Sequence, residues 1–189
     1  ITFAGSGALT ANVAINNGTF VTETVAGVLY TVVGDVDASA MVGTGALTFN
    51  GALETDSKIN ITGGRGADIL TGGSKADTII GGYGADNITG GPGIDILTGG
   101  AGNDTFTVVT KANFTLLTTA ETVSGDGGTD IINITDATGV SITAADLINI
   151  SSIEAINFGG AGDDAIVVSD QVFTNNGSTS IAITKSAAG

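Results

Sequence analysis

Residues 63–107 read GGRGADILT-GGSKADTII-GGYGADNIT-GGPGIDILT-GGAGNDTFT, which is five consecutive nine-residue units. Each unit opens with two glycines, has Asp at position six and has a large apolar residue at position eight. The aspartates are Asp68, Asp77, Asp86, Asp95 and Asp104, and the apolar residues are Leu70, Ile79, Ile88, Leu97 and Phe106. A fixed short period of this kind indicates a solenoid, in which each unit packs on its neighbours.

Each constrained position of the unit has its own physical cause. Glycine at positions one, two and four allows a turn with positive φ, and we expect that turn to aim backbone carbonyl oxygens inward. The Asp that follows adds a carboxylate, and oxygen ligands with negative charge suit Ca²⁺, which takes 6–8 of them. The last three residues predict a short strand whose position eight points inward. The glycines expected to contribute to these calcium loops are Gly64, Gly66, Gly73, Gly82, Gly84, Gly91, Gly93, Gly100 and Gly102.

The five units resemble the RTX (repeat-in-toxin) calcium-binding nonapeptide family, whose signature is G-G-x-G-x-D-x-U-x. The resemblance is strongest to the RTX segments of bacterial surface-layer and large secreted surface proteins. It implies an all-β fold, a right-handed parallel β-roll or β-helix solenoid with calcium-binding GGxGxD turns, flanked by further short strands. A metal-free β-helix or a Gly-rich linker is the alternative, but neither explains why Asp recurs at every ninth residue without a compensating Lys or Arg.

Two units complete one coil, so loops eighteen residues apart should stack on the same edge of the solenoid. The resemblance places each ion between two stacked loops, held by carbonyl oxygens and one Asp from each. This implies about three complete calcium sites, at Asp68/Asp86, Asp86/Asp104 and Asp77/Asp95. The unit 72–80 departs from the pattern because Lys75 replaces glycine at position four, and we expect the Asp77/Asp95 edge to bind more weakly.

The flanking segments keep parts of the pattern and divide the chain into three. Residues 1–53 lack the nonapeptide and predict short strands, either as metal-poor coils or as a small sandwich. We expect residues 54–124 to form the RTX β-roll and residues 125–189 to continue it as an enlarged coil with further Gly-Asp turns and C-terminal strands. That last segment holds GDGGTD (125–130) and GGAGDDAIV (159–167).

We expect one or more further calcium sites within residues 125–164. Asp130 and Asp164 are the expected ligands there, with Asp126 and Asp163 as helpers. Glu154 is either a further ligand or a charge on the outward face of a strand, and the outward position is the favoured interpretation.

The amino-acid composition excludes several classes of function and of binding site. The chain has 189 residues with no Cys and no His, which excludes disulfides, zinc–thiolate sites and a Ser-His-Asp triad. A net charge of −14 disfavours nucleic acid and anionic lipid as partners, and no apolar run is long enough to insert into a membrane. The segment at Ile1 does not resemble a signal peptide. No catalytic constellation is evident, so we do not expect an enzyme.

We therefore expect a secreted, extracellular or cell-surface structural protein that folds and assembles on binding Ca²⁺. Its form would be a surface-layer, filament or matrix subunit that self-associates into a lattice or filament, with a cell-surface polysaccharide as a further candidate partner. The family resemblance also implies type I secretion of the unfolded chain. The alternative is an accessory or secretion module of a type I-secreted adhesin or exoenzyme whose active domain lies elsewhere.

Overall fold

The computed structural model describes the repeat region without a gap and the flanks in part. The described residues are 5–6, 11–16, 23–25, 28–30, 35–42, 44–109, 121–135, 141–159, 165–166 and 182–185. They form strands almost throughout, and the 3₁₀ turn η2 (Ala144–Leu147) is the exception among them. None of the described helical residues belongs to a helix long and apolar enough to cross a membrane.

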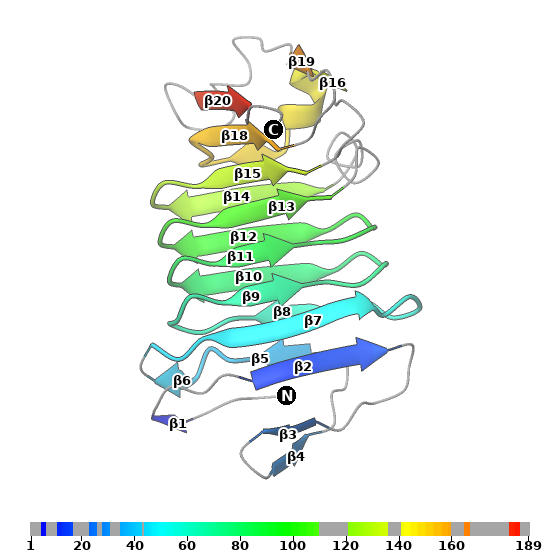
Figure 1. Ribbon diagram of the computed structural model, residues 1–189, viewed down its shortest axis with the longest axis vertical. Coiled ribbons are helices and arrows are strands. Elements are labelled where there is room, and N and C mark those ends of the chain that lie inside the picture. The colour runs from blue at the N-terminus through cyan, green and yellow to red at the C-terminus, as the bar shows by residue number, and fades with distance from the viewer. Residues whose placement is uncertain are drawn as a thin grey trace.

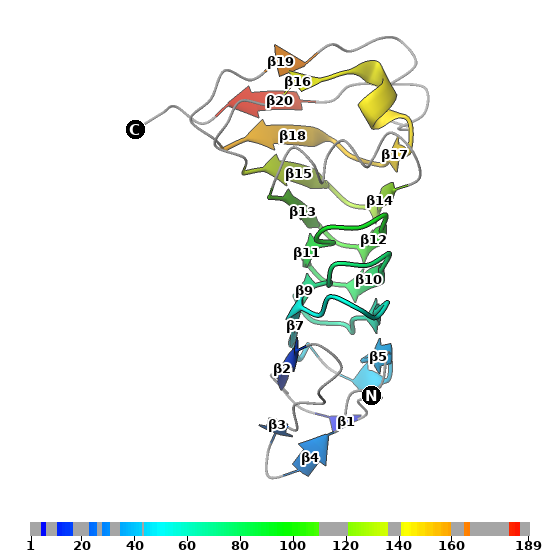
Figure 2. The ribbon, with the colours of Figure 1, turned by 90° about the vertical axis from the view of Figure 1, so that its right-hand side faces the viewer.

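Two parallel sheets face each other along the length of the molecule (Figures 1 and 2). One sheet has the order β17-β14-β12-β10-β8-β5 and the other has the order β2-β7-β9-β11-β13-β15-β18-β20. The strands of the first sheet are β5 (Asp35–Asp37), β8 (Asn60–Thr62), β10 (Thr78–Tyr83), β12 (Ile96–Ala101), β14 (Thr122–Gly127) and β17 (Ile150–Ser151). Those of the second are β2 (Ala11–Asn16), β7 (Leu47–Leu53), β9 (Ile69–Thr71), β11 (Asn87–Thr89), β13 (Thr105–Val108), β15 (Ile131–Ile134), β18 (Ala155–Phe158) and β20 (Ala182–Lys185).

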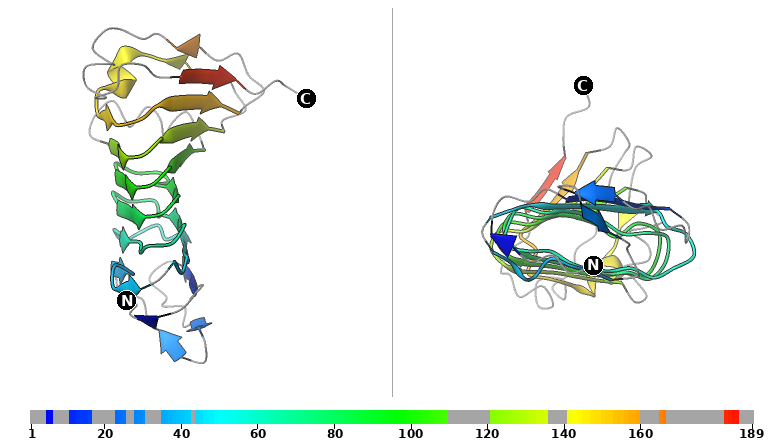
Figure 3. Two further views of the ribbon diagram at one scale, coloured as in Figure 1. Left: turned by 90° about the vertical axis from the view of Figure 1, so that its left-hand side faces the viewer. Right: turned by 90° about the horizontal axis from the view of Figure 1, so that it is seen from below.

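The chain alternates between the two sheets, so two repeat units make one coil. Ile79 pairs with Ile61 on one side and with Leu97 on the other, and Ile88 pairs with Leu70 and Phe106. Every one of these partners occupies position eight of its own unit. Seen along the stack, the coils superimpose as a flattened ring (Figure 3). The predicted all-β solenoid with parallel sheets and two units to a coil is confirmed.

Coils beyond the repeats are longer but stay in register. Asp104 and Asp130 occupy equivalent places although they are 26 residues apart, and Asp130 and Glu154 are equivalent at a separation of 24. The prediction that INISSIEAINF (148–158) contains solenoid strands is confirmed, because β17 pairs with β14 and β18 pairs with β15. The solenoid therefore accepts insertions between strands without losing its pairing.

The N-terminal segment adds strands to both sheets. β5 pairs in parallel with β8, and β7 pairs in parallel with β9 and with β2, which favours coils over a separate sandwich. Three small pairs lie outside the two sheets, one of them antiparallel. They are β1 (Gly5–Ser6) with β6 (Met41–Val42), β3 (Glu23–Val25) with β4 (Val28–Tyr30) in the antiparallel pair, and β16 (Ser141–Ile142) with β19 (Ala165–Ile166).

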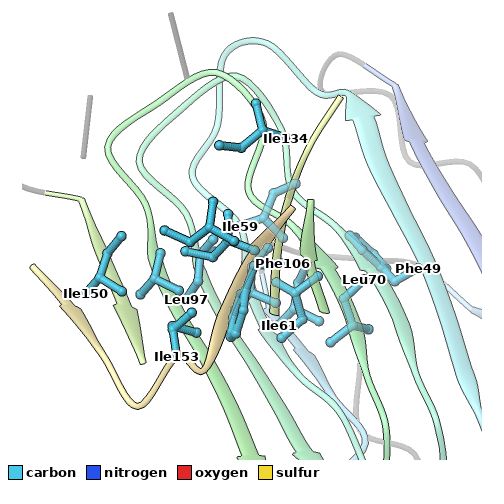
Figure 4. Close-up of a cluster of buried hydrophobic side chains, with 14 of the residues drawn as sticks. Phe49, Ile59, Ile61, Leu70, Leu97, Phe106, Ile134, Ile150 and Ile153 are labelled. Atoms are coloured by element: carbon cyan, nitrogen blue, oxygen red, sulfur yellow. The ribbon is translucent and has the colours of Figure 1, made fainter. Parts of the chain in front are cut away.

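The core is a column of apolar side chains enclosed between the sheets (Figure 4). Position eight of each unit fills it, and these five side chains are at most 4% exposed. Phe49, Ile61, Ile132 and Ile156 extend the column into the neighbouring coils. Because each strand contributes few inward residues, each coil buries little apolar surface, and the loops at the edges decide how stable the stack is.

Replacing Ile88 with Ala tests the column. Ile88 is fully buried between Leu70 and Phe106, so Ile88→Ala should lower the free energy of unfolding in calcium-saturated buffer by about 2–5 kcal/mol. Urea denaturation followed by circular dichroism measures this loss. Ile69→Ala removes the same atoms from a side chain that is 52% exposed, and its loss should stay below about 1 kcal/mol. Equal losses for the two variants would contradict the inward assignment of position eight.

Candidate metal centre

A ladder of buried carboxylates follows one edge of the solenoid. Four aspartates, each at most 2% exposed, stack there in the order Asp68, Asp86, Asp104 and Asp130. The backbone N–H of each Asp donates to Oδ1 of the next one along the stack, over 2.7, 2.9 and 2.8 Å. At the two ends, Leu47 N–H donates to Asp68 Oδ1 and Asp130 N–H donates to Oε2 of Glu154, both over 2.7 Å.

A second ladder follows the opposite edge. Ile59 N–H donates to Asp77 Oδ1, and Asp77 N–H donates to Asp95 Oδ1, both over 2.8 Å. The N–H of Thr122 donates to the backbone oxygen of Asp95 over 3.0 Å, which places Glu121 in register with Asp95. The predicted loop pairs therefore stack as expected, Asp68/Asp86 and Asp86/Asp104 on the first edge and Asp77/Asp95 on the opposite edge.

The second carboxylate oxygen distinguishes two forms of the loop. In the first two loops it stays within its own loop, because Asp68 Oδ2 accepts from Gly64 N–H over 2.7 Å and Asp77 Oδ2 accepts from Gly73 N–H over 2.5 Å. In the later loops the same oxygen is buried and has no hydrogen-bond partner. These unpartnered atoms are Oδ2 of Asp86, Asp95, Asp104 and Asp130.

The two forms of the loop also differ in the backbone conformation of the glycine at position two. Gly82, Gly91 and Gly100 have φ of 111°, 99° and 110°, and in their loops the position-two N–H does not reach Oδ2. The third to fifth loops also have positive φ at position four, at Gly84, Gly93 and Gly102. The expectation of positive φ is wrong for the first two loops, where Gly64, Gly66 and Gly73 lie outside that region. In these two loops the N–H groups of Gly64 and Gly73 donate directly to the carboxylates of Asp68 and Asp77.

Position one needs glycine for a different reason. A Cβ atom on Gly63 would lie 2.3 Å from Asp68 Oδ2 and 2.1 Å from the carbonyl oxygen of Gly81 in the next coil. A Cβ on Gly81 would likewise lie 2.3 Å from Asp86 Oδ2 and 2.6 Å from the carbonyl oxygen of Gly99. Only glycine fits at this position. Because glycine has no Cβ atom, a carboxylate oxygen and a carbonyl oxygen can come close together between stacked loops.

Burial makes the ladders costly to ionise. Desolvation, together with repulsion from Asp68 and Asp104, raises the pKa of Asp86 to about 7. Desolvation and repulsion from Asp77 raise the pKa of Asp95 to about 6. Burial raises the pKa of Glu121 to about 8, with a further contribution from Asp95. At neutral pH the carboxylates therefore need either protons or a cation.

The oxygens present fit a hard cation. A carboxylate without a donor, beside backbone carbonyls and far from any thiol or imidazole, is the ligand chemistry that Ca²⁺ prefers. In the described part of the chain, no three acidic side chains converge on one point. A cation bound between two stacked loops would therefore have one carboxylate from each loop, and backbone carbonyls would have to supply its remaining oxygens.

The flanking candidates fall into three groups. Asp130 lies on the first ladder, as expected. Asp126 is exposed at position two of its loop with φ of 66°, and its Oδ1 accepts from the Ser124 hydroxyl over 2.6 Å. Asp163 and Asp164 lie outside the described residues.

Three glutamates have roles that sequence reasoning missed or placed differently. The favoured outward position of Glu154 is wrong, because its carboxylate accepts the N–H of Asp130. Glu121 was not singled out, although it directly precedes a strand as the repeat aspartates do. Glu54 is buried at position one of the unit 54–62, and its Oε1 accepts from the N–H groups of Asp56 and Ser57 over 3.0 Å each.

The raised pKa values predict how calcium-free protein responds to pH. The ordinary pKa of Asp is 3.8, so raised values mean that the folded state binds protons more tightly than the unfolded chain. The stability gained this way is complete below pH of about 4 and is lost as pH rises to about 8. Thermal unfolding in calcium-depleted buffer should give a lower midpoint at pH 8 than at pH 5, and Asp86→Asn should flatten the difference. A midpoint that rises with pH would contradict this account.

Comparison with known proteins identifies the family of the nine-residue repeats. The family described as RTX calcium-binding nonapeptide repeat (4 copies) matches residues 62–97 and residues 80–107. No curated protein and no solved structure matches the chain. The matched family is a calcium-binding structural repeat that is typical of secreted bacterial proteins, and its match covers the loops from Gly63 to Asp104. Residues 62–107 are therefore RTX calcium-binding nonapeptide repeats, which here form a parallel β-roll.

Proposed function

We propose that this chain is an extracellular, calcium-dependent structural module of a secreted bacterial surface protein, a surface-layer, filament or matrix subunit. It folds and assembles when Ca²⁺ binds between its stacked loops. Within it, residues 54–124 are the calcium-binding roll, residues 125–189 continue that roll, and residues 1–53 lead into it. The module has no catalytic role, and any activity of the whole protein belongs to another part of it.

The observation that carries the proposal is the set of buried Oδ2 atoms without a hydrogen-bond partner at Asp86, Asp95, Asp104 and Asp130. An unpaired buried carboxylate oxygen is costly, and a bound cation removes the cost without adding a donor. The ions are held at Asp68/Asp86, Asp86/Asp104 and Asp77/Asp95, and a further one at Asp104/Asp130. The glycine carbonyls of the same loops complete their coordination, and Asp126, Asp163 and Asp164 assist in the C-terminal segment.

Linkage between binding and folding explains why such a module suits secretion. Ca²⁺ binds the stacked loops and not the unfolded chain, so each independent site stabilises the fold by about 1.4 kcal/mol when free calcium is about ten times Kd. Extracellular calcium modules bind with Kd of about 10⁻⁴–10⁻³ M, which is far above cytoplasmic calcium. The chain would stay unfolded inside the cell, pass through a type I channel and fold outside.

Apolar side chains on the outer faces support self-association. Ile69, Ile96 and Tyr83 are 52%, 49% and 60% exposed, and they lie on strands of both sheets. Aromatic residues are few, with two Tyr, seven Phe and no Trp, so the outer surface offers little for stacking on sugars. This balance favours a lattice or filament contact over a polysaccharide contact.

Calcium removal tests the folding half of the proposal. In millimolar calcium, far-UV circular dichroism should show β structure with a cooperative thermal transition, and in EGTA at the same pH the β signal should weaken and the transition should move to a much lower temperature. Asp86→Asn should shrink the calcium-induced rise in the melting temperature, because Asp86 belongs to two stacked pairs. Asp56→Asn changes the same charge at an exposed residue outside the ladders and should leave the rise intact. The same fold and melting temperature in EGTA and in calcium would refute the proposal.

Electron microscopy tests the assembly half. With millimolar calcium the protein should form ordered sheets or filaments, and with chelator these should disappear, because the outer faces exist only in the folded stack. Ile69→Ser and Ile96→Ser, which leave the core unchanged, should weaken the assemblies at equal calcium. A folded protein that stays monomeric at every concentration would instead support the accessory module of an adhesin or exoenzyme.

A further inference from the structure

The second ladder does not stop where the nonapeptide repeats stop. Glu121 directly precedes β14, just as Asp95 directly precedes β12 and Asp77 directly precedes β10. β12 and β14 pair with Ile96 opposite Thr122, so Glu121 stacks on Asp95 one coil further along. No GGxGxD sequence precedes Glu121, and the family match ends at residue 107.

Both carboxylates at this level of the stack are buried and incompletely bonded. Asp95 is 0% exposed and Glu121 is 5% exposed. Asp95 Oδ2 and Glu121 Oε2 each lack a hydrogen-bond partner. Two carboxylates repel each other when both are ionised, so this pair requires a positive partner or a shared proton.

A small cavity of about 10 Å³ lies beside Glu121. Gly90 and Gly91, the first two residues of the loop that ends at Asp95, line it together with Glu121, whereas Asp95 itself is not part of the lining. A Cβ on Gly90 would lie 2.3 Å from Asp95 Oδ2, so that oxygen also lies next to this glycine. The cavity is close to the size that one water-sized particle needs. The rest of its lining is apolar or hydroxylic and includes Leu97, Phe106, Thr107 and Val123.

We propose that Asp95 and Glu121 bind one Ca²⁺ at the junction between the repeats and the enlarged coil, in a site that the nonapeptide motif does not encode. The inference rests on the proposed calcium-dependent function and extends it to a residue outside the repeat. Carboxylate oxygens are the protein groups that Ca²⁺ prefers, and Glu serves as a ligand as readily as Asp. The ion joins the last loop of the second ladder to the coil that follows it.

Substitution of Glu121 by Gln separates a bound ion from a shared proton. Gln keeps the shape of the side chain, removes its charge and adds an N–H group that can donate a hydrogen bond to Asp95 Oδ2. Equilibrium dialysis of the full chain against millimolar calcium should show one ion fewer per chain for Glu121→Gln than for the unchanged protein. In calorimetry, Glu121→Gln should melt at an equal or higher temperature than the unchanged protein without calcium, and at a lower temperature with calcium.

Two reference variants make the outcome specific. Asp86→Asn lies on the first ladder and should lose bound calcium whatever Glu121 does, whereas Asp56→Asn should bind the full number of ions. If Glu121→Gln keeps the full ion count and the full calcium-induced shift while Asp86→Asn loses ions, the site at Glu121 does not exist. If Asp86→Asn also loses nothing, the proposed function itself fails.

Long-wavelength anomalous diffraction of the unchanged protein gives a test that does not depend on any variant folding. Crystals grown in calcium should show an anomalous peak within about 2.6 Å of both Asp95 and Glu121 carboxylate oxygens. Peaks on the first ladder without one beside Glu121 would overturn the inference.

Discussion

The structure depends on a hydrogen bond between coils, in which a carboxylate oxygen accepts a backbone N–H of the preceding coil. A buried N–H needs a partner, and an ionised carboxylate is among the strongest acceptors that a side chain offers. The bond repeats from Leu47 to Glu154 on one edge and from Ile59 to Asp95 on the other. It sets the spacing of the loops and draws each carboxylate into the interior. The same geometry that satisfies the backbone therefore accumulates buried negative charge.

The apolar core stabilises the fold, whereas the ionised carboxylates at the edges destabilise it. The apolar column and the parallel sheets favour the stack under all conditions, although each coil adds little buried surface. The edges favour it only when protons or cations neutralise the carboxylates, as the raised pKa values of Asp86 and Asp95 indicate. Because the ionised edges oppose the contribution of the core, the stability of the fold depends on pH and on the cations present.

Much of this arrangement could be predicted from five tandem units. The nine-residue period determines which side chains point inward and which loops stack, since two units close one coil. The period does not predict the form of each loop, because Gly64 and Gly82 occupy the same position in the unit yet only Gly82 has positive φ. It also cannot place Glu121 and Glu154, because they lie after insertions of irregular length. Only the strand pairing brings those two residues into register with the aspartates.

The direction of the hydrogen bond between coils has a consequence for how such stacks can join. Each coil offers the backbone N–H of its Asp toward the C-terminal side of the stack and its carboxylate oxygen toward the N-terminal side. The two faces of a coil are therefore chemically different. Two molecules that met through this contact would have to align head to tail, and repetition of a head-to-tail contact gives an open, directional fibre rather than a closed dimer.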